Sequence, residues 1–213
     1  TPQNLLGLEE FDQSFFDKID EIDNLISKNI DFNTIINDLN IKPQEYFVFT
    51  FHRPGNVDNI EKLTELVSVI KDIAQKGKVV FPIHPRTKNN LEKNGLLADV
   101  ISENIILTDP VGYIDFMKLI GNSKGVITDS GGIQEETTFM QVPCLTIRPN
   151  TERPVTNEIG SNTLLGLDKT AILKHVEEIN SGSYKKGEIP EILEFFMGKN
   201  TPKRKNFIMD NLI

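Results

Sequence analysis

Two histidines of the sequence each lie within two residues of an arginine. His52 directly precedes Arg53, and His84 is followed by Pro85 and Arg86. Arginine binds phosphate and carboxylate groups through a planar fork of donors, so these paired side chains predict an anionic ligand. A single His at the end of a strand is also a common hydrogen-bonded structural residue. Both interpretations of His52 and His84 stay open from these residues alone.

A glycine pair, Gly131 and Gly132, follows Ser130 in a second polar segment. Glycines let the backbone approach a ligand closely, and a helix that begins there points its first N–H groups at a phosphate. An ordinary turn in which Ser130 caps a helix explains the same residues equally well. Glu135 and Glu136 project about 100° apart on a helix, so only one of them can face a ligand. A carboxylate one turn beyond a phosphate is suited to ribose hydroxyls.

Other candidate ligand residues have weaker support. Phe116 has the ring needed to stack on a base, although an aromatic residue in a helix is more often part of the core. His175 lies among Lys and Glu residues and is interpreted as a surface residue. A metal site at His52 and His84 is rejected because no third ligand has a suitable spacing, and no cofactor is expected.

These polar segments follow apolar runs of strand length, and stretches with helical period separate the runs. The runs cover residues 46–51, 79–83, 105–107, 125–128, 144–147 and 163–165. The helical stretches cover residues 60–74, 88–98, 114–120, 133–140 and 169–179. Alternating strands and helices, with strands that are apolar throughout, predict a doubly wound α/β fold around a parallel sheet, which is Rossmann-like. The carboxyl ends of its strands would form the ligand crevice.

Three regions are expected along the chain. Residues 1–45 form a leading helix, with helical period over 8–28, and a connector. Residues 46–180 form the Rossmann-like domain. Residues 181–213 form a polar tail, which ends in a short apolar segment over 207–213 that is suited to a last helix. Two small lysine clusters of the tail, at 185–186 and 203–205, are interpreted as a solvated face.

Composition excludes several classes of function. The 213 residues carry 23 Lys+Arg against 31 Asp+Glu, a net charge of −8, which argues against non-specific binding of nucleic acid or anionic membranes. No apolar run is long enough to span a membrane. Cys144 is the only cysteine, so no intrachain disulfide can form, and a reducing, cytoplasmic setting is expected. The absence of an initiator Met suggests that the chain is part of a longer product.

Four segments together resemble one enzyme family, the non-hydrolysing UDP-N-acetylglucosamine 2-epimerases. They are residues 50–58 (TFHRPGNVD), 84–86 (HPR), 128–136 (TDSGGIQEE) and 148–154 (RPNTERP). The resemblance extends from about residue 46 to residue 166, with a weaker match at 196–198. It implies the carboxyl-terminal domain of a two-domain fold of the glycosyltransferase-B type. It also implies an isomerase that interconverts UDP-GlcNAc and UDP-ManNAc.

The resemblance implies a role for individual residues. Ser130, Gly131 and Gly132 would bind the UDP phosphates, and Glu136 would bind the ribose. The uracil would be held by the backbone of Val111 and by Phe116. The phosphate and sugar side of the cleft would be lined by His52 and Arg153, with His52 catalytic. A second, allosteric UDP-GlcNAc would contact Arg53 and His84.

The resemblance also implies parts that residues 1–45 do not supply. Family members are thought to eliminate UDP across C1 and C2 of the sugar and to add it back on the other face, which needs a base at C2. Such a base would belong to an amino-terminal domain, so this chain alone is expected to be inactive. A homodimer is implied as well. Alternatives that remain are a glycosyltransferase-B carboxyl-terminal domain, a non-catalytic UDP-sugar sensor, and a related UDP-diacetamido-uronate as the substrate.

Overall fold

A computed structural model describes residues 34–190, and they form one parallel sheet with the strand order β3-β2-β1-β4-β5-β6. The strands are β1 (Tyr46–Thr50), β2 (Lys78–Pro82), β3 (Ile105–Thr108), β4 (Gly125–Thr128), β5 (Cys144–Thr146) and β6 (Asn162–Leu164). All five pairings between neighbouring strands are parallel. The predicted doubly wound, Rossmann-like α/β fold is confirmed.

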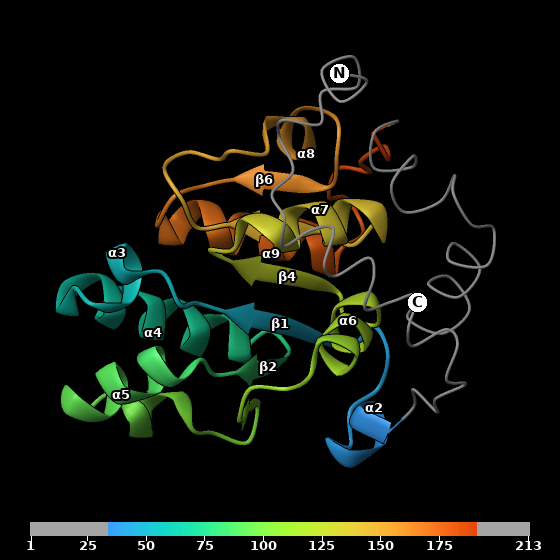
Figure 1. Cartoon of the computed structure of the whole chain (residues 1–213). Coiled ribbons are helices and arrows are strands. Elements are labelled where there is room, and N and C mark those ends of the chain that lie inside the picture. The colour runs from blue at the N-terminus through green and yellow to red at the C-terminus, as the bar shows by residue number, and fades with distance from the viewer. Residues whose placement is uncertain (1–33, 191–213) are drawn as a thin grey trace, which may run out of the picture.

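Helices cover both faces of this sheet (Figure 1). One face carries α4 (Ile60–Ala74), α5 (Pro85–Lys93), the 3₁₀ helix η3 (Leu97–Val100) and α9 (Lys169–Asn180). The other face carries α2 (Thr34–Asp38), α6 (Tyr113–Gly121) and α7 (Gly131–Phe139). Two short helices, α3 (Pro54–Val57) and α8 (Pro154–Glu158), lie in the connections that follow β1 and β5.

Apolar side chains of the strands pack into two core layers, one on each face of the sheet. Phe47 and Phe49 of β1 pack toward α4 and α9, whereas Val48 packs toward α6 and α7. All three are completely buried. Burial on both faces explains the uninterrupted apolar run of β1, because successive side chains point to opposite sides.

Local signals in the sequence account for the helix starts. The side chain of Asn59 accepts a hydrogen bond from the Lys62 N–H and caps α4, and the side chain of Asp168 caps α9 through the Ala171 N–H. The predicted ranges 60–74 and 169–179 match these two helices closely.

The helix predicted over 88–98 differs from the observed one. The observed helix α5 begins at Pro85 because Pro fits the first helical position and the His84 side chain accepts a hydrogen bond from the Arg86 N–H. It ends at Lys93, shortly before Gly95, which has a φ of 71°. A turn in this left-handed region separates α5 from η3, so one predicted helix is two elements.

Several predicted features lie outside the described residues. They are the leading helix over 8–28, the lysine cluster at 203–205, the match at 196–198 and the last helix over 207–213.

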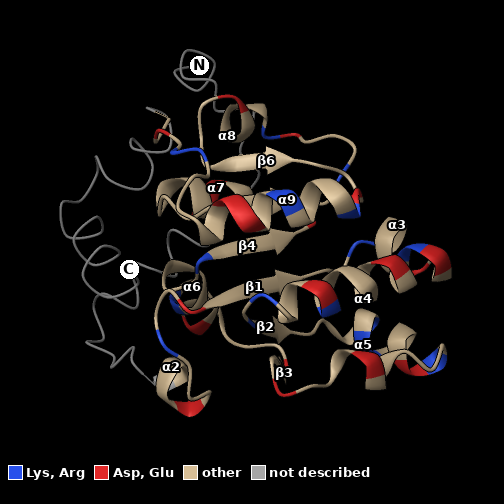
Figure 2. Cartoon of the chain, turned by 180° about the vertical axis from the view of Figure 1, so that it is seen from behind, with Lys and Arg blue, Asp and Glu red and all other residues tan. Residues whose placement is uncertain are grey.

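Within residues 34–190, no helix is long and apolar enough to cross a membrane. Acidic and basic residues are interspersed along α4, α5 and α9 (Figure 2).

Candidate functional site

The predicted ligand residues gather at the carboxyl edge, defined here as the edge of the sheet at which the parallel strands end. Thr50 at the end of β1 pairs with Thr128 at the end of β4. From these two central strands the chain order runs outward in opposite directions, toward β2 and β3 on one side and toward β5 and β6 on the other. Such a switch point is where open α/β sheets form their ligand crevices.

A buried carboxylate, Asp129, organises this switch point. Its side chain is fully buried and accepts hydrogen bonds from the backbone N–H groups of His52, at 3.2 Å, and Arg53, at 3.0 Å. It also accepts one from the Asn56 amide at 3.0 Å, and it lies 3.2 Å from Nδ1 of His52. Asp129 therefore fixes both the loop after β1 and the imidazole of His52.

The electrostatics of Asp129 follow from these donors. Burial raises the pKa of its carboxyl, but hydrogen bonds from His52, Asn56 and the Arg53 backbone outweigh burial and hold the pKa below its ordinary value. The carboxylate is thus stable in its charged form although it is buried.

The two predicted histidines lie next to each other. The ring centroids of His52 and His84 are 5.7 Å apart. His84 is exposed and has a structural task as well, since its Nδ1 accepts the hydrogen bond from Arg86 that caps α5. Arg86 itself forms an ion pair with Asp58.

The glycine pair forms the first turn of α7, and Ser130 is its N-cap. The Ser130 side chain makes no capping hydrogen bond, although the Ser130 N–H donates to Thr128 Oγ1 at 3.0 Å. The hydroxyl therefore does not satisfy the helix N–H groups, which an ordinary capped turn requires. This arrangement favours the phosphate-cradle interpretation over the capped turn.

A carboxylate from another loop lies against this helix start. A methyl group built on Gly131 would lie 2.6 Å from Oε1 of Glu152 and 3.7 Å from Nη1 of Arg148. Glu152 pairs with Arg148 at 2.7 Å and with Arg53 at 3.3 Å. The hydrogen bond with Arg148 is the main reason that the pKa of Glu152 falls to about 2, although partial burial opposes it.

Arg153, predicted to line the cleft, is buried and paired with a helix residue. Its Nε lies 2.8 Å from Oε1 of Glu135, and both side chains are almost completely buried. The neighbouring loop is held by Gln134, whose amide oxygen accepts hydrogen bonds from Thr151 at 2.7 Å and from Asn162 at 3.1 Å. Arg153 therefore fastens the loop after β5 to α7.

The residues predicted to hold the base and ribose lie around α6 and α7. Val111 and Phe116 are half-buried and pack against the core layer on that face. Glu136 is 4% exposed and accepts a hydrogen bond from the Tyr113 hydroxyl at 3.2 Å. Tyr113 thus joins the predicted ribose carboxylate to the loop that carries Val111.

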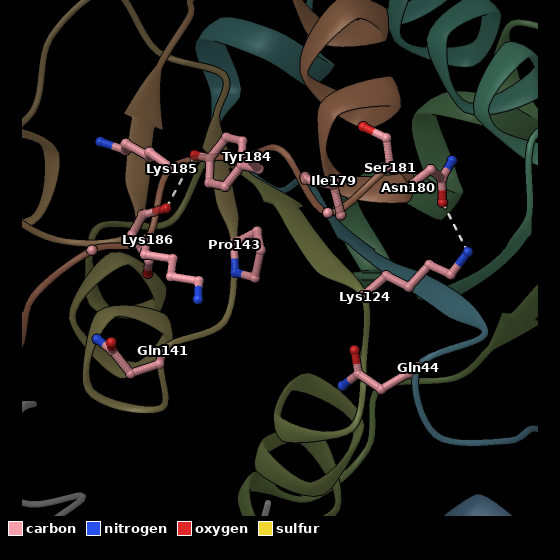
Figure 3. Close-up of a pocket in the computed structure, with 13 residues that line it drawn as sticks. Gln44, Lys124, Gln141, Pro143, Ile179, Asn180, Ser181, Tyr184, Lys185 and Lys186 are labelled. Carbon is pink, nitrogen blue, oxygen red and sulfur yellow. Dashed lines mark hydrogen bonds between the residues drawn. The ribbon is translucent and has the colours of Figure 1, made fainter.

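A cavity of about 690 Å³ opens at the opposite, amino edge of the sheet (Figure 3). Lys124 lies on one side of it and Lys186 on the other. The Lys124 ammonium donates to Asn180 Oδ1 at 2.8 Å. None of the predicted ligand residues lines this cavity, and ligands of open α/β sheets bind at the carboxyl edge.

Sequence reasoning gave no site role to Asp129 or Glu152, and it gave no individual role to Arg148. All three stand inside the polar segments, so their positions after strand ends were a usable signal. Among residues 34–190, no group of three or more His, Cys, Asp or Glu side chains is placed to hold a metal ion.

Comparison with known proteins shows the family to which the chain belongs. The family model described as UDP-N-acetylglucosamine 2-epimerase matches residues 13–204. A curated UDP-N-acetylglucosamine 2-epimerase of Methanococcus maripaludis is 45% identical over 141 residues, or 65% of this chain and 38% of that protein. One of Methanocaldococcus jannaschii is 42% identical over 149 residues, or 68% of this chain and 39% of that protein.

A solved structure supports the same relationship. The UDP-GlcNAc 2-epimerase of M. jannaschii, in complex with UDP-GlcNAc and UDP, superimposes with a TM-score of 0.69 at 35% identity. The match covers 86% of this chain and 52% of that one. The chain thus spans roughly two fifths of the curated relatives and half of the solved one. By its sequence and its fold, the chain belongs to the UDP-N-acetylglucosamine 2-epimerase family.

Proposed function

We propose that this chain is the nucleotide-binding half of a UDP-N-acetylglucosamine 2-epimerase, an isomerase that interconverts UDP-GlcNAc and UDP-ManNAc. The observation that carries the proposal is the uncapped start of α7 at the switch point, with Gly131 and Gly132 in its first turn. Backbone N–H groups and the helix dipole favour a phosphate there. Family membership supplies the uridine nucleotide as the ligand.

Individual residues take the following roles in this proposal. Ser130 and the two glycines hold the diphosphate, and Glu136 accepts from the ribose, with Tyr113 orienting its carboxylate. Val111 and Phe116 flank the uracil. His52, oriented by Asp129, acts at the reacting end of the nucleotide, and Arg153 supports the loop beside it. Arg53 and His84, at the rim, take a second nucleotide sugar.

The proposed reaction needs two kinds of group. Elimination of UDP across C1 and C2 requires stabilisation of the departing diphosphate, which the start of α7 and His52 would supply. It also requires a base at C2, which we assign to an amino-terminal domain beyond this chain. A homodimer and a cytosolic location complete the proposal, the latter supported by the single buried cysteine, Cys144.

Calorimetric titration with UDP tests the nucleotide site. The 213-residue chain is expected to bind UDP with a dissociation constant in the micromolar to millimolar range. Ser130→Ala should weaken binding about tenfold, because it removes a donor to the diphosphate. Ser102→Ala, which changes an exposed serine shortly before β3, is the matched control and should bind UDP like the wild type. No heat of binding with UDP at high protein concentration would contradict the proposal.

A glycosyltransferase domain would use the same phosphate cradle, and a second experiment separates the two reactions. The chain joined to its amino-terminal domain is incubated with UDP-GlcNAc in D₂O. An epimerase exchanges the proton at C2 and incorporates deuterium there, whereas a glycosyltransferase leaves C2 untouched. Family membership favours the first outcome.

A further inference from the structure

Three charged side chains converge on the start of α7, although they come from two different loops. Glu152 places one carboxylate oxygen beside Gly131 and is held by Arg148 at 2.7 Å and by Arg53 at 3.3 Å. Arg53 follows β1, and Arg148 and Glu152 follow β5. An acidic side chain of this chain therefore lies where the proposed function puts a phosphate.

The cations around Glu152 have unused donor capacity. Within the described part of the chain, Nη1 of Arg148 and Nε of Arg53 are buried and make no hydrogen bond. Arg148 is 9% exposed, and its Nη1 lies 3.7 Å from the point that a methyl group on Gly131 would occupy. A buried guanidinium donor without an acceptor is costly, so this donor points to a ligand at the start of α7.

Glu152 lies between the guanidinium groups of Arg53 and Arg148, next to the positive end of the α7 dipole. A diphosphate carries more negative charge than Glu152 and has more acceptor oxygens, so it can satisfy Nη1 and Nη2 of Arg148 together. The Glu152 side chain is 45% exposed and can move outward when it is displaced.

We propose that Arg148 is a ligand of the nucleotide diphosphate and that Glu152 is an internal anion which occupies its place until the nucleotide binds. The inference rests on the proposed function, since it takes the diphosphate as the ligand of α7. Arg53 is 40% exposed at the rim and retains the Glu152 carboxylate after it leaves Arg148. Glu152 then competes with the ligand and lowers its affinity.

The test measures binding of UDP, and of inorganic pyrophosphate as a probe without uridine, to the 213-residue chain. Glu152→Gln removes the competing charge and should tighten binding of both probes about fivefold. Glu158→Gln is the matched control: it removes one exposed acidic charge at the end of α8, outside the ion pairs that Arg53 and Arg148 form with Glu152, and should change affinity less than twofold. Arg148→Lys keeps the charge but loses the fork, and it should weaken binding of both probes about tenfold.

The outcomes separate this inference from the proposed function. If the wild type binds UDP but Glu152→Gln binds it equally or more weakly, Glu152 does not compete, and the inference is overturned while the proposed function stands. If Arg148→Lys, checked for folding by circular dichroism, binds both probes like the wild type, Arg148 is not a ligand. Binding of pyrophosphate with the predicted variant effects, but none of UDP, would overturn the nucleotide assignment and keep the anion exchange at Glu152.

Discussion

Asp129 shows how one buried side chain can organise a site that it does not itself line. Its carboxylate collects backbone and side-chain donors from the loop after β1 and orients the ring of His52. The same donors keep its pKa below the ordinary value in spite of burial. In the unfolded chain the carboxyl returns to its ordinary pKa, so its charge stabilises the folded state above that pKa.

Replacement of this carboxylate should destabilise the protein in a pH-dependent way. Asp129→Asn is expected to lower the free energy of unfolding by about 2 kcal/mol at pH 7, because an amide cannot accept all four hydrogen bonds. The difference should narrow as the pH falls below 3.8, the ordinary pKa, since the wild type then loses its own contribution. Urea denaturation between pH 7 and pH 3 measures both.

Asp109→Asn is the control for this experiment. Asp109 follows β3 at the same edge of the sheet, but its side chain is 84% exposed. The control should change stability by less than about 0.5 kcal/mol at any of these pH values. If the free energies of unfolding of the wild type and Asp129→Asn differ by the same amount from pH 7 to pH 3, the role given to the carboxylate is contradicted.

A methyl group at Gly131 should separate binding from folding. Its one short contact, at 2.6 Å, would be with the end of the flexible Glu152 side chain, and alanine is favoured over glycine in a helix. Gly131→Ala should therefore keep the free energy of unfolding within about 1 kcal/mol. The methyl group fills the phosphate position, so affinity for UDP should fall at least about tenfold. Calorimetric titration with UDP measures this loss of affinity. Gly55→Ala is the control, because a methyl group on Gly55 would have no atom within 4 Å. Equal affinities of the two variants would refute a phosphate at Gly131.

At the scale of the elements, residues 184–188, which follow α9 and were predicted as part of a polar tail, contact the outer strands of the sheet. Tyr184 is 8% exposed. Its hydroxyl lies within hydrogen-bond distance of two carbonyl oxygens, that of Cys144 at the start of β5 and that of Ser161 just before β6. The Glu188 N–H donates to the Ile159 carbonyl at 2.7 Å. Residues 184–188 therefore fasten onto the outer strands, while the domain boundary predicted at 180 stays a prediction.

Close backbone contact in this segment predicts a sensitive glycine. A methyl group on Gly187 would lie 2.2 Å from backbone atoms of Gly160 and Ser161, which cannot move without shifting β6. Gly187→Ala should therefore lower the free energy of unfolding by about 2 kcal/mol in urea denaturation. Gly77→Ala is the control, since its methyl group would meet the Phe47 ring at an ordinary 3.8 Å. Equal stability of the two variants would mean that residues 184–188 do not support the sheet.

At the scale of the whole molecule, all candidate ligand residues lie on one edge of a single sheet. In the proposed function, the start of α7 and the loops after β1 and β5 would supply the groups that bind an anion and stabilise a leaving diphosphate. The chain spans only about two fifths of its curated relatives, and we place the base at C2 in the part that it does not cover.

This division predicts a protein that binds but does not turn over. The 213-residue chain should bind UDP yet convert no UDP-GlcNAc to UDP-ManNAc, as followed by proton NMR. Addition of the amino-terminal domain should restore conversion, because it supplies the base. Conversion by this chain alone would place the base among its own residues and contradict the division.

Local sequence patterns determined the six strands, most of the helices and the edge on which the polar segments gather. These features depend on the period of apolar residues and on capping, which act over a few positions. The helix predicted over 88–98 begins earlier, at Pro85, because Pro85 fits the first helical position and His84 caps the helix.

Only the tertiary structure decided which charged groups meet. Asp129 reaches donors 77 positions away at His52, and Glu152 reaches Arg53 across 99 positions. Arg153 pairs with Glu135, whereas Arg148 pairs with Glu152 and lies beside Gly131. The two arginines occur in the same loop and are chemically identical, so their local sequence cannot distinguish them. Packing of the loop against α7 pairs Arg153 with Glu135 inside that helix and brings Arg148, paired with Glu152, beside the start of the helix.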